Sequence, residues 1–145
     1  MNILFIGSRS DWHVDLWTRH FTKNHQVYLF SDKEEYLKNQ AYHNITVIES
    51  EGVFGRILNL FKLKSHKWYQ LNKLVSVSVY AKRVDAVIDK YDIDIVHAHS
   101  LYYGYLASFI KSNVTIVFTP MGSDIILHAQ NNRLYRHMAL NAFKK

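Results

Sequence analysis

The sequence contains no cysteine and a single proline, and it has no long run of apolar residues. Without cysteine the chain cannot form a disulfide scaffold, a thiolate metal site or a cysteine nucleophile. No stretch approaches the roughly 20 apolar residues that a membrane-spanning helix needs. The apolar run at Met1–Gly7 is short and no basic region precedes it, so we expect no signal peptide. These absences predict a cytoplasmic protein that could meet a membrane only at its surface.

The composition is that of a soluble globular domain. The chain has 145 residues, of which 48% are hydrophobic and 21% are charged. This length suits one compact domain and is too short for two ordinary ones. The net charge of +6 predicts an attraction to phosphates, anionic lipid headgroups or nucleic acid. No recognised nucleic-acid-binding motif accompanies the charge, so we expect no nucleic-acid partner.

Short apolar runs alternate with segments of helical periodicity along the chain. The apolar runs predict buried strands at residues 2–7, 26–30, 45–48, 93–97 and 114–118. Helical spacing predicts helices over about 12–23, 102–110 and 132–143, with a short one near 34–39. The second half of segment 52–91 also has a helical apolar stripe, which outweighs the strand-like alternation of residues 75–79.

This alternation predicts an α/β fold for a single domain spanning residues 1–145. Its form is a Rossmann-like open parallel sheet with helices on both faces. Pro120 follows the last strand, where it interrupts no ladder. Ligands of open α/β sheets bind outside the carboxyl ends of the strands. The candidate site therefore lies where three distant loops meet, at residues 7–13, 97–104 and 119–124.

Two histidines stand two residues apart near the end of a predicted strand. His97 and His99 point the same way if the strand continues that far. One of them could pack in the sheet while the other lies in the loop, or His99 could contact substrate; for a functional role we favour His99. A metal site would need a third ligand, and none stands at metal-ligand spacing, so the sequence predicts no metal site.

The first predicted loop, GSRSDWH, lies between a strand and a helix. Backbone N–H groups at the helix start could bind phosphate, with Gly7, Ser8 and Arg9 close to it. The segment is neither a G-x-G-x-x-G nor a Walker sequence, so it does not support a dinucleotide or ATP site. The alternative to phosphate binding is an ordinary capped turn. His13, at the helix start, either contacts a ligand hydroxyl or is a surface histidine.

The last predicted loop, TPMGSD at residues 119–124, leads from a strand into a helix. Gly122 stands where a side chain would obstruct the approach of a ligand. Ser123 or Asp124 could contact that ligand or serve as the N-cap of the next helix. Both roles can hold together.

Residues 54–84 include basic and aromatic side chains but no aspartate or glutamate. Such a segment suits the surface of an anionic bilayer, where aromatic rings settle at the level of the headgroups. The alternative is that the apolar residues belong to the core and the lysines form a solvated face. The candidates for facing a membrane are Arg56, Lys62, Lys64, Lys67 and Trp68.

Three segments match motifs of one known family. ILFIGSRSDWHVDLWTRHFTKNHQVYLFS, which starts at Ile3, is similar to an opening strand, an S-x-H-x-x-x-W-type first helix and the turn into a second strand. DIDIVHAHS at 92–100 is similar to a D-x-V-H-x-H segment, and VFTPMGSD at 117–124 to a T-x-H-G-x-D loop. In this order they resemble the amino-terminal domain of family-4 glycosyltransferases of the GT-B type, over essentially the whole chain.

The resemblance implies roles for residues in all three loops. It places His13 and His99 on the acceptor side of a cleft between two domains, and residues 122–124 beside the transferred sugar. Gly7 would mark the tight turn beneath the donor phosphates. Met121 replaces a histidine that many members place near the donor sugar. The first loop also lacks the double glycine common in the family, which weakens the case for phosphate binding there.

The resemblance implies a hexosyltransferase-type enzyme that takes a sugar from a nucleotide-sugar donor and retains its anomeric configuration. The acceptor would be a glycan or a lipid-linked glycan in bacterial surface polysaccharide biosynthesis, at the inner face of the membrane. A carboxy-terminal domain would hold most of the donor site, so we expect this chain to fold alone and to be inactive alone. No cofactor or metal is implied, because protein cations and helix N-termini stabilise the leaving diphosphate.

Two alternatives remain open from the sequence. A sugar-nucleotide epimerase of the same two-domain architecture would share the fold but would have no use for a membrane-facing segment. A flavodoxin-like or receiver-like binding module would be complete at this length. A receiver needs clustered acidic residues after its first strand, and Asp11 alone does not supply them.

Overall fold

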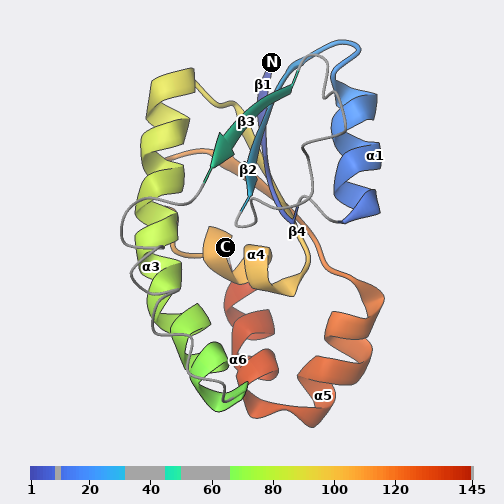
Figure 1. Ribbon diagram of the computed structural model, residues 1–145, viewed down its shortest axis with the longest axis vertical. Helices are drawn as coiled ribbons and strands as arrows, with labels where there is room; N and C mark the ends of the chain where they lie inside the picture. The colour runs from blue at the N-terminus through green and yellow to red at the C-terminus, as the bar shows by residue number, and fades with distance from the viewer. Residues whose placement is uncertain (9–10, 32–44, 50–65, 145) are drawn as a thin grey trace.

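The computed structural model of the chain describes residues 1–8, 11–31, 45–49 and 66–144. Its helices and strands are arranged around one twisted sheet (Figure 1). In chain order they are β1 (Asn2–Ile6), α1 (Trp12–Phe21), β2 (Gln26–Ser31), β3 (Ile45–Glu49), α3 (His66–Tyr91), β4 (Ile95–His99), α4 (Leu101–Ala107), β5 (Thr115–Thr119), the π-helical segment η1 (Asp124–His128), α5 (Ala129–Asn131) and α6 (Arg133–Ala142).

The five strands form one sheet in the order β3-β2-β1-β4-β5, and each neighbouring pair is parallel. β1 is the central strand, and its Phe5 is paired with Leu29 of β2 on one side and His97 of β4 on the other. The chain winds outward from β1 to β3 and then returns to β4 beside β1. The reversal between β1 and β4 is the topological switch point at which sheets of this kind bind ligands. The predicted parallel sheet is confirmed.

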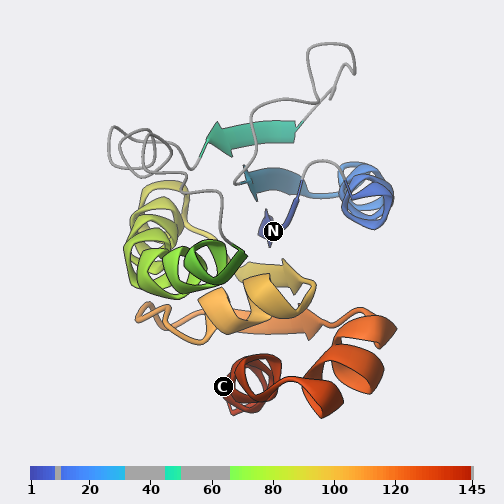
Figure 2. The ribbon, with the colours of Figure 1, turned by 60° about the horizontal axis from the view of Figure 1, so that its bottom comes forward.

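Both faces of the sheet are buried by helices, as the continuous apolar strands predict. Successive residues of β1 point to opposite faces. Leu4 and Ile6 pack with residues of α3 and α4, whereas Ile3 and Phe5 pack with Val14 of α1. Figure 2 shows α1 on one side of the sheet and the long α3 on the other. The predicted Rossmann-like fold, with helices on both faces, is therefore confirmed.

Two boundaries differ from the sequence-based expectation in ways that affect the site. The strand expected at 93–97 is β4, Ile95–His99, because the chain turns at Asp92, whose φ of 46° is left-handed. His99 is therefore the last residue of a strand rather than a loop residue. The helix expected after residues 119–124 is the π-helical segment η1 followed by the short α5, and the alternation at 75–79 lies in α3, as expected. The short helix expected near 34–39 falls outside the described residues.

The carboxy-terminal helix α6 forms a second core with α4. Tyr105 of α4 and Met138 of α6 are buried in the same apolar cluster, together with Val77 of α3. Phe118 of β5 packs against this cluster and also against the main core. Phe118 therefore links the edge of the sheet to the helical layer beneath it, and α4 must approach its ring closely.

Gly104 of α4 allows this approach, and its replacement by alanine should destabilise the fold. An added Cβ would collide with the ring of Phe118, which is itself packed against two apolar clusters. Overpacking typically costs about 1–3 kcal/mol, and the better helix propensity of alanine returns up to about 1 kcal/mol. Urea unfolding should therefore show that Gly104→Ala loses about 1–2 kcal/mol.

Gly122→Ala is the matched control, because an added Cβ there has no described atom within 4 Å and should leave stability unchanged. Adding Phe118→Leu to Gly104→Ala should restore part of the loss by making room for the new methyl group. A Gly104→Ala variant as stable as the parent chain would contradict this account of the α4–β5 contact.

Candidate functional site

The carboxyl ends of β1, β4 and β5 lie side by side at one rim of the sheet. Ile6 is paired with Ala98, and His99 is paired with Thr119. The loops that follow these strands therefore start next to one another although they are far apart in the sequence. For the described residues of the segments 7–13, 97–104 and 119–124, the contacts below join the first segment to the second and the second to the third, as predicted.

Asp11 begins α1 and fixes the position of His13. As the N-cap residue, Asp11 accepts a hydrogen bond at Oδ1 from the backbone N–H of His13, at 3.0 Å. The same oxygen lies 3.0 Å from Nδ1 of the His13 ring. The ring of Trp12 packs against that imidazole, with ring centroids 3.6 Å apart. These contacts with Asp11 and Trp12 hold the His13 imidazole at the start of α1.

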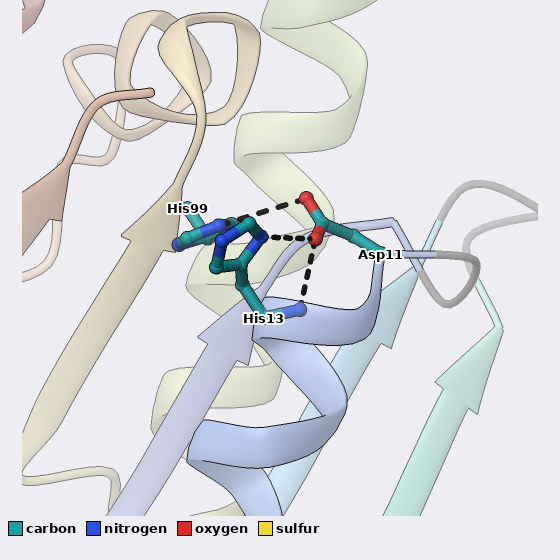
Figure 3. Close-up of side chains that lie close together, drawn as sticks. All are labelled: Asp11, His13 and His99. Carbon is teal, nitrogen blue, oxygen red and sulfur yellow. Dashed lines mark hydrogen bonds and ion pairs between the residues drawn. The ribbon is translucent and has the colours of Figure 1, made fainter. Parts of the chain in front are cut away.

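His99 points from the end of β4 toward this pair, as Figure 3 shows. Its Nε2 lies 3.6 Å from Oδ2 of Asp11, and its ring centroid is 5.5 Å from that of His13. The His99 side chain is only 4% exposed. At 3.6 Å the contact with Asp11 is too long for a hydrogen bond. Among the described residues, Nε2 of His99 is buried without a hydrogen-bond partner.

Burial is the main influence on the charge of His99. Desolvation lowers the pKa of His99 below its usual value, because the protein interior disfavours the imidazolium. Asp11 raises this pKa, His13 lowers it and Asp124 raises it, all by smaller amounts. The net direction is downward, so His99 is neutral at pH 7. A neutral, unpartnered imidazole nitrogen can accept a proton, donate a hydrogen bond or ligate a metal, depending on its tautomer.

His97 is buried within the fold and has a hydrogen-bond partner there. Its Nε2 is 2.8 Å from Oγ1 of Thr119, and its ring packs against Phe5 and Trp17. Burial, reinforced by the neighbouring His99, lowers the pKa of His97 to about 4. His97 and His99 both point to the α1 face of the sheet, as their spacing predicts. The hydrogen bond to Thr119 satisfies His97, which leaves His99 as the histidine available to a ligand.

The loop after β5 is tied to α4 through Asp124. Asp124 Oδ2 accepts a hydrogen bond from the backbone N–H of Leu101 at 2.9 Å. The sequence suggested Ser123 or Asp124 as the N-cap of the following helix. The structure corrects this expectation: Ser123 precedes η1 but its side chain makes no capping bond, and the carboxylate of Asp124 instead caps a different helix. Asp124 thereby holds the third loop against the end of β4.

Ser100 connects His99 to α4 in a strained conformation. Its φ is 72° and its ψ is 161°, a combination that glycine adopts far more readily than other residues. Its N–H donates to the carbonyl of Thr119, and its carbonyl accepts from the N–H of Gly104. Such strain costs of the order of 1–3 kcal/mol and persists only where the surroundings enforce it. The sharp turn lets α4 start directly after His99.

The first loop shows tight packing at Gly7. An added Cβ would lie 2.8 Å from Cγ2 of Val14 and 3.7 Å from Cβ of His99. Ser8 contributes a carbonyl that accepts from the N–H of Asp11. The absence of a side chain at Gly7 thus lets α1 approach both β1 and β4. The expectation that Gly7 and Ser8 lie near a phosphate remains a prediction, and Arg9 falls outside the described residues.

Asp11 was not among the site residues predicted from the sequence. An aspartate before a helix is explained fully by capping, and only its second oxygen, directed toward His99, distinguishes it. Asp11, His13 and His99 each offer a ligand atom, and these atoms lie within 4.8 Å of one another. Together they can bind a hydroxyl group or a cation. We call these three residues the rim cluster.

The expected membrane-facing segment is largely outside the described residues. Arg56, Lys62 and Lys64 are not described, and Lys67 and Trp68 lie in the first turn of α3. None of the described helices is both long enough and apolar enough to span a bilayer.

The lowered pKa of His97 should make the fold less stable in acid. The unfolded-state pKa is near 6.5 and the folded-state pKa about 4, so between these values the unfolded chain binds more protons. The free energy of unfolding should therefore fall as the pH drops from 7 to 4, by about 3 kcal/mol from this residue, and no further below pH 4. Urea unfolding at several pH values, with a chelator present, measures the slope.

His97→Gln is the comparison variant, because glutamine does not titrate and can still bond to Thr119. Its stability should depend less on pH over the same interval, although carboxylates still titrate there. Identical pH profiles for the two proteins would show that His97 is not buried as described.

Comparison with known proteins shows the family to which the chain belongs. No protein of curated function matches the sequence significantly. Residues 2–145 match the family described as Glycosyl transferase 4-like. The match covers β1, β4 and β5 and the three loops that follow them, and the parallel sheet is the one expected for such a domain. The chain belongs to the glycosyl transferase 4-like family.

Proposed function

We propose that the chain is the acceptor-side domain of a glycosyltransferase that moves a sugar from a nucleotide-sugar donor to a glycan or lipid-linked glycan. Family membership supports transfer of a sugar, and it favours this function over a flavodoxin-like module or an epimerase. The observation that carries the assignment of the site is the convergence of Asp11, His13 and His99 at the switch point of the sheet. The acceptor class and the surface polysaccharide pathway rest on resemblance alone.

The rim cluster has the chemistry to bind an acceptor hydroxyl. A hydroxyl at His99 Nε2 would give that buried nitrogen the hydrogen-bond partner it lacks among the described residues. The carboxylate of Asp11 can accept a second hydrogen bond from the acceptor, and His13 is partly exposed beside it. In the transfer, the bond from the anomeric carbon to the diphosphate oxygen breaks and a bond to the acceptor oxygen forms. The hydroxyl proton leaves with the diphosphate, and the configuration is retained.

Gly122, Ser123 and Asp124 are assigned to the transferred sugar. The space around Gly122 is open, because an added Cβ has no described atom within 4 Å. A ligand can therefore approach the backbone there. Asp124 is already bonded to the N–H of Leu101 through Oδ2, so any contact with a sugar hydroxyl would have to use its other oxygen.

The proposal includes a second domain that holds most of the donor site. In enzymes of this type that domain carries a two-glutamate motif and basic residues on the diphosphate, so the present chain alone would be inactive. The donor is a substrate, and no separate cofactor is assigned to the transfer step. Gly7, Ser8 and Arg9 would lie near the donor phosphates when the two domains close.

His99→Ala should lower the turnover of the complete enzyme, the chain joined to its donor-binding domain, by at least about tenfold. The substitution removes the buried nitrogen that faces the acceptor. Release of nucleoside diphosphate from a panel of nucleotide-sugars, with acceptor present, measures the rate. His20→Ala is the matched control, because His20 lies in the same helix as His13 but is exposed and is not part of the rim cluster.

Turnover equal to the parent in the His99→Ala enzyme would remove His99 from the site. No release of nucleoside diphosphate by the complete parent enzyme, with any donor, would overturn the proposed activity itself. Release that does not depend on acceptor would point to hydrolysis instead.

We further propose that the basic and aromatic side chains of residues 54–84 bind an anionic membrane surface on the cytoplasmic side. Replacing Lys64, Lys67 and Trp68 together should weaken binding to phosphatidylglycerol vesicles by at least about tenfold, since each lysine near the surface contributes about 1 kcal/mol. Sedimentation with vesicles measures the change, and the binding should weaken with added salt.

Replacing Lys23 and Lys111, two exposed lysines elsewhere in the chain, provides a charge-matched control for the two lysines of the triple variant. The thermal midpoint of the triple variant should stay close to that of the parent. A large drop in that midpoint would show that the segment belongs to the core, and unchanged sedimentation would show that it does not bind lipid.

A further inference from the structure

We propose that Asp11, His13 and His99 form a binding site for a divalent transition metal ion of the Zn²⁺ type. The three residues come from the end of β4 and the start of α1, which the sheet brings together at its switch point. One oxygen and two imidazole nitrogens face one another with all three ligand atoms within 4.8 Å (Figure 3). The site does not depend on the proposed glycosyl transfer, because it is defined by ligand atoms alone.

The three ligand atoms are near enough to gather around one tetrahedral ion once their side chains move. Zinc binds histidine nitrogen and carboxylate oxygen at about 2.0–2.2 Å, so two ligand atoms of a tetrahedral site lie about 3.3–3.5 Å apart. The structure has 3.0 Å from Asp11 Oδ1 to His13 Nδ1 and 3.6 Å from Asp11 Oδ2 to His99 Nε2. The two distances involve different oxygens of Asp11, and the three ligand atoms lie within 4.8 Å of one another. The side chains must therefore move to bring one Asp11 oxygen and both imidazole nitrogens around a single ion.

His99 provides an independent indication that a ligand is expected here. Its Nε2 is buried, has no hydrogen-bond partner among the described residues, and faces Asp11 across a gap too long for a hydrogen bond. Buried polar atoms in folded proteins are almost always paired. A metal ion between His99 and Asp11 would satisfy this nitrogen directly.

The ligand atoms and the exposure of the site favour a transition metal such as zinc, with one coordination position left open. Two imidazoles and one carboxylate suit zinc and related transition metals better than calcium or magnesium, which prefer oxygen ligands. Three protein ligands leave the fourth position for water or another oxygen ligand. Asp11 and His13 are 23% and 29% exposed, so an ion can enter from solvent. The N-cap bond to His13 N holds the Asp11 carboxylate in place.

This ion would lie on the acceptor side, apart from the leaving diphosphate. The expectation that protein cations stabilise the diphosphate is therefore unaffected. If the proposed function also holds, the ion and a directly bound acceptor hydroxyl are alternative partners of His99 Nε2, and with the ion in place the hydroxyl would take the open position on the ion. Metal binding and sugar transfer are measured separately, so the failure of one proposal can be told from the failure of the other.

Titration of the purified, metal-free chain of residues 1–145 with ZnCl₂ in a calorimeter tests the site. We expect one equivalent of tight binding. Asp11→Asn, His13→Gln and His99→Gln should each weaken it by at least about tenfold, because even the loss of an outer-shell partner typically costs that much. Asp11→Asn is the most informative variant, because the substitution removes the anionic ligand while asparagine can still cap α1.

The control is His20→Ala, which removes an exposed histidine from α1 and should bind zinc as the parent does. Circular dichroism verifies that each variant is folded, and if His99→Gln unfolds, Asp11→Asn and His13→Gln decide the question. The proposal is overturned if the parent shows no saturable binding. It is also overturned if the folded cluster variants bind as tightly as the parent, because the other histidines of the chain would then hold the ion.

Discussion

The parallel pairing of β1 with β4 is the constraint on which the rest of this structure depends. It sets the end of β4 against the loop that follows β1, so residues nearly ninety positions apart, Asp11 and His99, come within 3.6 Å. The contact also requires α1 to start close to the sheet. Gly7 permits this, since a Cβ there would meet Val14. The site is thus a consequence of sheet topology and of one close approach rather than of a continuous sequence motif.

The two histidines of β4 are both buried but have different hydrogen-bonding surroundings. His97 is packed between aromatic rings and satisfied by Thr119, so it serves the fold. His99 is equally buried but faces Asp11 and His13 without a hydrogen bond of its own among the described residues. The strained turn at Ser100 and the Asp124 cap on Leu101 hold this end of β4 against the loop after β5. The two histidines therefore have different surroundings although only Ala98 separates them.

The fold could be predicted from the sequence because apolar strands and helical stripes are local signals. The same periodicity predicted that His97 and His99 share a face, and open-sheet topology predicted where the loops meet. Asp11 was missed because capping explains an aspartate at that position equally well. The partner of Asp124 could not be read either, because Leu101 lies 23 positions away in another helix. The start of β4 was misplaced since nothing in the sequence reveals that Asp92 adopts a left-handed conformation.

The most direct test of the account is whether His13 and His99 are neighbours in solution. Their ring centroids are 5.5 Å apart, so the metal-free chain should show nuclear Overhauser effects between the two imidazoles, together with those between β1 and β4. The two rings would then share one rim of the sheet, as both the acceptor site and the metal site require. Clear effects between β1 and β4 with none between His13 and His99 would contradict the central claim.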